Sequence, residues 1–566
     1  MSRRELTMEL QQYDSEKNLD GKSLKELSVK PPKHGTVLLI YPNMVSEAYT
    51  PLTMIAAIME DEGYSVTAMI NTFRNPLDVD DYVKRVREKK IDIVGISSMT
   101  YKIIRTNTLV KALKDEGCYV MLGGPHPSDC PEEGIESGAD VVVRGEGEET
   151  VRELCRYWNG DPDTSMAEIK GITYRTIDGV ICTTFPRDRI KDLDTLPSPE
   201  LDIFNEDIDI FTQPDGLVKG LHRVFTSRGC PAKCTFCDWT VFGQRMGYHS
   251  ISAVVDEIKK RADRFGMDSF TINDDTFTVN RHRVEEFCEL ISKVEPKISW
   301  RCSTRASLVN LELLKMMKEA GCHLVTFGLE SGDEETLLRT DKNISVEENY
   351  RAPIMAHEAG LQVYANLMIG FPWETVESIE NNIKLIYETQ DAVFLYQVSG
   401  SLVPFPGTGI YKKYADEYGF KDYWLREEYQ EAGIQTFQNS TNPYAISTYY
   451  QRNLFDDAYI AEEVFFDYSN EFKRKAREFV FEVGKHNLKS LYPNEPLKRS
   501  FILGVSRVSS TVYSNFPRLE KSFGSKFFKL RNYKRPTKER RMDVARGFVL
   551  NKLGDDASKT GEFGLQ

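Results

Sequence analysis

The sequence predicts an α/β protein with a doubly wound parallel sheet at its N-terminal end, a partial barrel of six strand–helix units, and a mostly helical C-terminal region. Two observations predict this fold class. Apolar runs of strand length alternate with helix-length segments in two separate series, which is the pattern of parallel β–α–β units. The first of these runs is continuously apolar, as a strand buried on both faces requires. With 566 residues the chain is too long for one hydrophobic core, so several domains are expected.

The first series follows a polar extension over residues 1–33 and occupies residues 34–160. Its first helix is expected to start at Thr50–Pro51, because threonine is a suitable cap and proline is favoured at the first helical position. The expected strands are Thr36–Tyr41, Ser65–Ile70, Asp92–Ser98, Tyr119–Gly124 and Asp140–Gly145, and further helices lie near 79–89, 104–116, 131–137 and 148–158. A ligand is expected at the carboxyl ends of these parallel strands.

A linker rich in Asp and Pro, residues 161–219, carries a hairpin and leads to the second series at residues 220–404. The expected strands are Val224–Arg228, Ser269–Asn273, Ser299–Ser303, Leu324–Glu330, Val363–Ile369 and Val393–Val398, with helices near 251–265, 281–293, 310–320, 346–359 and 376–388. Such units predict a partial parallel barrel, whose chemistry belongs at the carboxyl ends of its strands.

Residues 405–566 are first dense in Tyr and Phe and then amphipathic near 458–485, which predicts a mostly helical C-terminal domain. The aromatic residues either form core or close over a bulky apolar molecule. A basic stretch at residues 529–541 is either a solvated tail or a contact for an anionic substrate or membrane surface.

The net charge of −13 argues against general nucleic-acid binding. No apolar run approaches the roughly 20 residues of a membrane span, and the N-terminus lacks the apolar segment of a secretory signal. We therefore expect a cytoplasmic protein.

Three of the ten cysteines, Cys230, Cys234 and Cys237, fall within eight residues, directly after the first expected barrel strand. In a reducing compartment, clustered cysteines bind metal more often than they form disulfides. Thiolates suit zinc or iron–sulfur clusters, but structural zinc normally has four ligands. Three thiolates on a four-iron cluster leave one iron open, and an open iron can chelate the amino and carboxylate groups of a small molecule.

The spacing Cys-x3-Cys-x2-Cys, with Phe236 before the last cysteine, resembles the motif of the radical S-adenosylmethionine (SAM) superfamily. The flank Ser227–Pro231 resembles that of its cobalamin-dependent branch. The resemblance implies a [4Fe-4S] cluster on the three cysteines and SAM on the open iron, as the source of a 5′-deoxyadenosyl radical. It also implies that Phe236 lies beside the bound cofactor.

Two further barrel segments resemble motifs of the same superfamily. The end of the fourth expected strand resembles the motif in which a carboxylate and a hydroxyl, here Glu330 and Ser331, face SAM. The segment Met368–Thr375 resembles the fifth-strand motif, which implies that the backbone at Gly370 lies against adenine. An ordinary strand-to-helix turn is the alternative for this segment. Arg305, after the third strand, is a candidate ligand of the SAM carboxylate.

Asp274 and Asp275 end the second expected barrel strand, where they either order the cysteine loop or substrate, or serve as a helix cap or ion-pair partner. Cys302 is expected to be a small buried residue rather than a metal ligand. The sequence identifies no catalytic acid, base or nucleophile.

The N-terminal series resembles the Rossmann-like cobalamin-binding domain of the same enzymes. Glycines at strand ends let a backbone approach a flat ligand closely. The residues that the resemblance places near cobalamin are Ser97, Ser98, Gly123, Gly124, His126 and Glu146. The loop Pro42–Thr50 has neither the Asp nor the His of the cobalt-ligating motif Asp-x-His-x-x-Gly. We therefore expect cobalt without a protein histidine on its lower face. His126 is expected to contact the nucleotide tail or to be structural. The alternative is a domain that has kept the fold and lost the cofactor.

Together these features predict a cobalamin-dependent radical SAM methyltransferase that acts on an unactivated carbon or a phosphinate phosphorus of a small molecule, natural product or lipid. A carbon without a lone pair cannot attack a sulfonium, so radical chemistry is needed. The alternatives are an oxidative cyclase or rearrangement enzyme with the same cofactors, and a non-catalytic iron–sulfur or cobalamin sensor. Flavodoxin or ferredoxin is the expected electron donor, and nucleic acid is not an expected partner.

Overall fold

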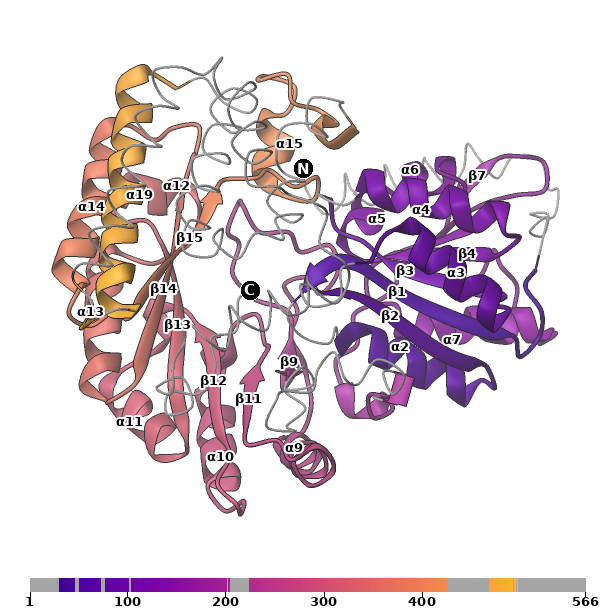
Figure 1. Cartoon of the computed structure of the whole chain (residues 1–566), viewed down its shortest axis with the longest axis horizontal. Helices are drawn as coiled ribbons and strands as arrows, with labels where there is room; N and C mark the ends of the chain where they lie inside the picture. Colours follow the sequence, from indigo (N-terminus) through magenta and orange to yellow (C-terminus); the bar gives the residue numbers. More distant parts are fainter. Residues whose placement is uncertain are drawn as a thin grey trace, which may run out of the picture.

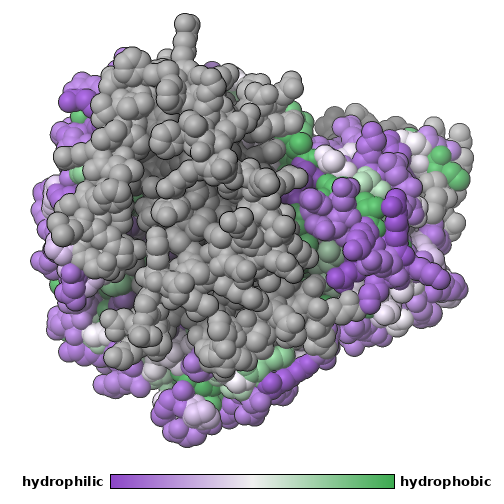
Figure 2. Space-filling model, in the orientation of Figure 1, coloured by the Kyte–Doolittle hydropathy of each residue, from purple (hydrophilic) through white to green (hydrophobic). Residues whose placement is uncertain are grey.

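The computed structural model describes residues 30–45, 50–72, 77–100, 103–200, 202–203, 223–425, 468–491, 493, 494 and 496. They form two α/β lobes that lie side by side (Figure 1). The N-terminal lobe contains a seven-stranded sheet and the second lobe a six-stranded sheet. On the face shown in Figure 2, the N-terminal lobe is largely hydrophilic, with hydrophobic residues scattered among the hydrophilic ones.

The N-terminal sheet has five parallel strands in the order β2-β1-β3-β4-β5, which confirms the doubly wound fold. The strands are β1 (Thr36–Val45), β2 (Ser65–Thr72), β3 (Ile93–Ser97), β4 (Tyr119–Gly123) and β5 (Val141–Val143). The helices are α2 (Thr50–Asp61), α3 (Val79–Lys89), α4 (Ile103–Asp115), α5 (Pro125–Asp129), α6 (Pro131–Glu136) and α7 (Glu148–Asn159). The strand order reverses between β1 and β3, and ligands of such sheets bind at the carboxyl ends there.

Strand β1 is continuously apolar because its side chains alternate between two cores. Leu39 packs into the core beneath α2 and α7, and Leu38 packs into the core beneath α3 and α4. Both faces of the sheet are therefore covered, as the sequence pattern predicts.

The hairpin expected in the linker is part of the N-terminal sheet. Strand β6 (Ile172–Arg175) pairs antiparallel with β5, and β7 (Ile181–Thr183) pairs with β6. The sheet therefore extends beyond residue 160, where the sequence placed the end of the domain. The two strands have four and three residues, too few for a clear periodic signal.

The barrel sheet is fully parallel, in the order β15-β14-β13-β12-β11-β8, which confirms the partial barrel. The strands are β8 (Arg223–Val224), β11 (Ser269–Ile272), β12 (Ser299–Thr304), β13 (Cys322–Glu330), β14 (Gln362–Ile369) and β15 (Leu395–Ser401). The α-helices are α9 (Ile251–Phe265), α10 (Arg281–Ile291), α11 (Leu311–Glu319), α12 (Glu334–Arg339), α13 (Val346–Glu358) and α14 (Val376–Thr389). Short 3-10 helices are η2 (Leu193–Thr195), η4 (Phe277–Val279) and η5 (Ala306–Leu308).

The first expected barrel strand, Val224–Arg228, is broken in two. Only β8 pairs within the barrel sheet, whereas β9 (Ser227–Arg228) pairs antiparallel with β10 (Gly247–Tyr248). The break lies at Thr226, whose N–H donates to the Asp274 carboxylate at 2.7 Å. The chain therefore leaves the barrel sheet shortly before the first clustered cysteine.

The described part of the C-terminal region packs onto both lobes. Helix α15 (Gly409–Tyr414) and η6 (Tyr423–Leu425) contribute to an apolar cluster that includes Ile103 of α4 and Phe371, which follows β14. The aromatic residues Tyr423 and Trp424 are buried core. Residues 458–467 and the basic stretch 529–541 lie outside the described residues.

Helix α19 (Asn470–Leu491) lies against α14 and covers the edge strand β15 (Figure 1). The Asn487 amide donates to the Tyr396 carbonyl at 2.8 Å and accepts from the Tyr396 N–H at 2.9 Å. One side chain thus satisfies backbone groups that an unprotected edge would expose. No described helix combines the length and apolar character of a membrane span.

Candidate functional site

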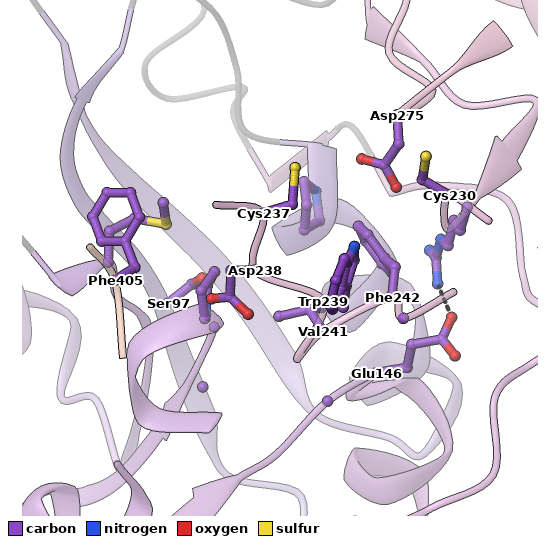
Figure 3. A pocket seen from close by; sticks show the side chains of 18 of the residues that line it. Ser97, Glu146, Cys230, Cys237, Asp238, Trp239, Val241, Phe242, Asp275 and Phe405 are labelled. Carbon is purple, nitrogen blue, oxygen red and sulfur yellow. Dashed lines mark hydrogen bonds and ion pairs between the residues drawn. The ribbon is translucent and has the colours of Figure 1, made fainter. Parts of the chain in front are cut away.

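A cavity of about 640 Å³ lies between the carboxyl ends of the two sheets (Figure 3). Its N-terminal wall includes Ser97, Gly123, Gly124, Gly145 and Glu146. Its barrel wall includes Cys230, Cys234, Phe236, Cys237, Trp239, Phe242, Asp275, Arg305, Glu330 and Lys342. The cysteine site and the glycine-rich site expected from sequence therefore face the same cavity.

The three cysteines lie on a tightly turned loop. Cys237 N–H donates to the Cys234 carbonyl at 3.1 Å. Gly229 has a φ of +90°, and a Cβ there would lie 2.6 Å from the Arg245 carbonyl oxygen, so this position requires glycine. Figure 3 shows the Cys230 and Cys237 thiols projecting from the same side of the loop.

Two carboxylates that follow the second barrel strand, β11, order this loop. Asp274 Oδ1 accepts from the N–H groups of Thr226 (2.7 Å) and Ser227 (3.1 Å), and its Oδ2 accepts from their hydroxyls at 2.5 and 2.7 Å. Asp275 accepts from Gly229 N–H at 3.1 Å. Burial raises the pKa of both carboxyls, and these hydrogen bonds oppose the rise. Of the roles left open by the sequence, both residues fill that of ordering the loop.

A buried ion pair lies beside the cysteines. Lys342 Nζ is 2.9 Å from Glu330 Oε1, and the side chains are 5% and 11% exposed. Arg305 Nη1 donates to Cys234 Sγ at 3.5 Å. Sequence reasoning missed Lys342, because it lies in a turn twelve residues after Glu330 and belongs to no motif.

The environment of Cys234 favours its thiolate. The hydrogen bond with Cys237 lowers the pKa of the Cys234 thiol to about 6, and the charges of Lys342 and Arg305 add to this effect against the opposing effect of burial. Metal binding requires the deprotonated form of cysteine. The Cys234 sulfur is therefore suited to bind a metal, whereas the same hydrogen bond raises the pKa of the Cys237 thiol.

Two barrel residues expected near SAM do not line the cavity. Ser331 is fully buried, and its hydroxyl donates to Asn382 of α14 at 2.9 Å. Gly370 has a φ of +92°, and its N–H donates to Glu374 Oε2 at 2.6 Å. Burial raises the pKa of Glu374 to about 8. Glu374 thus fixes the turn after β14, while Ser331 is turned toward a helix behind the strand.

The N-terminal wall is built on a close turn between strand ends. Gly124 has a φ of +94°, and a Cβ there would lie 2.7 Å from Ser97 Oγ and 2.9 Å from the Ser98 carbonyl oxygen. The Ser98 hydroxyl itself lies 2.8 Å from Thr106 of α4, so this side chain faces away from the cavity. Ser97, Gly123 and Gly124 remain as a floor with little side-chain bulk.

His126 is buried behind this floor and does not line the cavity. Its Nδ1 lies 3.1 Å from Thr100 Oγ1, and its Nε2 lies 3.3 Å from Glu133 Oε2. Trp424 Nε1 donates to the same Glu133 oxygen at 2.9 Å. These contacts support the structural role, one of the two alternatives for His126. Cys130 also lies within 4.8 Å of His126 and Glu133.

The residues on both walls fit the cofactors that the sequence implies. On the barrel side, two of the three thiols, Cys234 and Cys237, stand next to the Lys342 cation, and Cys234 also accepts from Arg305. Nearby cations stabilise thiolate ligands. On the N-terminal side, the glycine and serine backbone at the ends of β3 and β4, beside the strand-order reversal, suits a flat ligand.

The comparisons with known proteins agree with this arrangement. Residues 224–386 match the Radical SAM superfamily, and residues 50–155 match the B12 binding domain. An uncharacterized methyltransferase of Pyrococcus horikoshii is 32% identical over 400 residues, 69% of this chain and 83% of that protein. The anaerobic magnesium-protoporphyrin IX monomethyl ester cyclase of Cereibacter sphaeroides is 26% identical over 68% of this chain and 65% of its own length.

The solved structure of the cobalamin-dependent SAM radical enzyme OxsB, with aqua-cobalamin and SAM bound, has a similar fold. Its TM-score is 0.59 at 15% identity, over 94% of this chain and 82% of that chain. The chain belongs to the cobalamin-binding radical SAM enzymes. Its cofactors are a [4Fe-4S] cluster, SAM and cobalamin.

Proposed function

We propose that this enzyme transfers a methyl group to an unactivated carbon or a phosphinate phosphorus of a small molecule, natural product or lipid. The observation that carries the proposal is the shared cavity, in which the cysteine loop faces the glycine floor. Methyl transfer is also the activity named for the Pyrococcus horikoshii relative.

When bound, the cluster and SAM supply radical chemistry for hydrogen abstraction, and cobalamin supplies a methyl donor. The chain's own part is to bind and orient. We propose that Cys230, Cys234 and Cys237 hold the cluster and that the loop is set by Asp274 and Asp275.

The SAM site proposed here uses residues that face the cysteines. Lys342 or Arg305 binds the SAM carboxylate as a cation, and Glu330 accepts from its ammonium or ribose hydroxyls. Phe236 supports this group, since its ring lies 5.8 Å from Lys342 Nζ. Ser97, Gly123, Gly124 and Glu146 form the cobalamin side of the same proposal, and cobalt lacks a protein histidine below it.

The test uses anaerobic protein loaded with all three cofactors, a strong reductant, methyl-labelled SAM and candidate substrates chosen from neighbouring genes. The proposal expects labelled, methylated product together with 5′-deoxyadenosine. A matched pair of variants, Cys234→Ala and Cys302→Ala, separates cluster loss from a general effect, because Cys302 is buried in the barrel core. Absence of 5′-deoxyadenosine from wild type under strong reductant would favour a non-catalytic sensor and reject the proposal.

An oxidative cyclisation or rearrangement is the second candidate. The similarity to the cyclase of Cereibacter sphaeroides favours it. The same experiment distinguishes the two, because a cyclase would form 5′-deoxyadenosine and convert substrate without gain of the label.

The reductant proposed for the reaction is a flavodoxin or ferredoxin, and the compartment proposed is the cytoplasm. The proposed reductant is tested by adding a reduced flavodoxin or ferredoxin to the loaded enzyme and measuring 5′-deoxyadenosine formation.

A further inference from the structure

The width of the shared cavity depends on how the cysteine loop is joined to the N-terminal lobe. A radical and a methyl donor must be held at a set separation from one substrate, because small displacements reduce rates strongly. Side chains that span the two lobes beside the cavity are therefore candidates for positioning residues.

Arg228 is such a side chain. It ends β9, two residues before Cys230, and it is 7% exposed. Its Nη1 lies 2.7 Å from Glu148 Oε1 and 3.3 Å from Glu146 Oε1, and both glutamates belong to the N-terminal lobe. In Figure 3, a dashed line marks the ion pair at the Glu146 carboxylate. The Phe242 ring lies 5.3 Å from the guanidinium carbon.

Burying the charges of Arg228, Glu146 and Glu148 costs desolvation free energy. The glutamate side chains are 4% and 7% exposed, so three charges lie almost without solvent between the lobes. Replacing a buried ion cluster with apolar groups often leaves stability unchanged or increases it. A contribution to stability is therefore a weak explanation for this buried ion cluster. Fixing the relative position of the cysteine loop and the N-terminal lobe is a stronger explanation.

A second connection passes through the segment after β7. Ile190 N–H donates to Glu146 Oε2 at 2.9 Å. Next to it, Arg189 Nη2 donates to the carbonyls of Trp239 (3.2 Å) and Thr240 (2.9 Å), which follow the last clustered cysteine. A Cβ on Gly243 would lie 2.9 Å from Arg189 Nε, so the loop and this segment are in close contact.

Glu146 therefore joins both ends of the cysteine loop to the N-terminal lobe. Glu146 Oε1 pairs with Arg228, which precedes the three cysteines in the sequence. Glu146 Oε2 accepts from Ile190 N–H, and the adjacent Arg189 donates to the part of the loop that follows the cysteines. We propose that Glu146, Arg228 and Arg189 form an interdomain tie that sets the separation between the cluster and cobalamin. Arg228 and Arg189 are positioning residues, and Glu146 in addition lies on the cobalamin side of the proposed site. The inference rests on the proposed function only in naming the two cofactors.

The test compares Glu146→Gln and Arg189→Ala with the control Arg187→Ala. Arg187 lies on the same segment, but its Nε donates to Thr150 of α7 at 2.9 Å and its guanidinium pairs with Glu153. Each protein is loaded with both cofactors and reduced until the cluster is [4Fe-4S]+ while the cobalamin remains cob(II)alamin. The distance between these two spins is then measured by pulsed electron paramagnetic resonance (EPR). The tie predicts one narrow distance distribution for wild type and for Arg187→Ala, and a broader or longer one for the other two variants.

Amide hydrogen exchange of residues 239–247 in cofactor-free protein gives a second readout. Loss of a charged hydrogen bond should speed exchange there by about tenfold in Glu146→Gln and Arg189→Ala, and not in Arg187→Ala. Unchanged distances in both variants would overturn the proposed role in setting the separation, and unchanged exchange in both would overturn the tie itself. If wild type bound no cobalamin, the proposed function would fail, but the exchange result would still decide whether the tie exists.

Discussion

The four hydrogen bonds of Asp274 make the geometry of the cysteine loop open to a quantitative test. In Asp274→Ala, the amides and hydroxyls of Thr226 and Ser227 lose their acceptor. At about 1 kcal/mol for each bond, local stability should fall by about 4 kcal/mol. Asp274→Asn should cost only about 1 kcal/mol, because its oxygen can keep both amides while its NH2 donates to the two hydroxyls.

Amide hydrogen exchange at Thr226 and Ser227 measures these costs directly. A loss of about 4 kcal/mol corresponds to about 1,000-fold faster exchange, and about 1 kcal/mol to about fivefold. Asp268→Ala, at the opposite end of β11, is the control, because Asp268 is exposed and its carboxylate accepts, among the described residues, only from the hydroxyl of its neighbour Ser269. Less than tenfold acceleration in Asp274→Ala, or equal effects of alanine and asparagine, would refute the reasoning.

Three further predictions follow from other parts of the fold. Cys234→Ala should lose most of its iron and sulfide after anaerobic reconstitution, whereas Cys302→Ala should retain them. Iron and sulfide analysis measures this difference, and equal contents in the two variants would contradict the assignment of Cys234 as a cluster ligand. The pKa of Glu374 is raised to about 8 in the folded protein against 4.5 ordinarily, so wild type should lose stability as pH rises through that interval. The melting temperature of Glu374→Gln relative to wild type should therefore increase from pH 6 to pH 9, and a difference independent of pH would disprove this. Asn487→Ala should lower unfolding stability by about 2–4 kcal/mol, because it leaves two groups of Tyr396 unpaired, and a urea titration without such a shift would show that the edge contact contributes little.

The regular elements were predictable because their signals are local. Strand β1 is apolar throughout, since both of its faces meet helices, and this pattern is visible in the sequence. The break between β8 and β9 was not predictable in the same way. It depends on Asp274, which lies 48 positions from Thr226 and competes for its N–H.

In the candidate site, too, residues with a local sequence signal were predictable, and residues placed by distant partners were not. The clustered cysteines are recognisable because three ligands for one metal site lie close together in the sequence. Lys342 is placed beside Glu330 only by the turn after α12, a six-residue helix too short to give a clear periodic signal in the sequence. The positions of Ser331 and His126 outside the cavity depend on partners elsewhere in the fold, Asn382 and Glu133.

The most direct measurement is EPR of anaerobically purified protein, combined with iron, sulfide and corrinoid analysis. Three thiolates that leave one iron free predict a reduced [4Fe-4S] signal whose g-values shift when SAM is added, in protein that also contains corrinoid. Zinc at the loop, or a cluster signal that SAM leaves unchanged, would contradict the account.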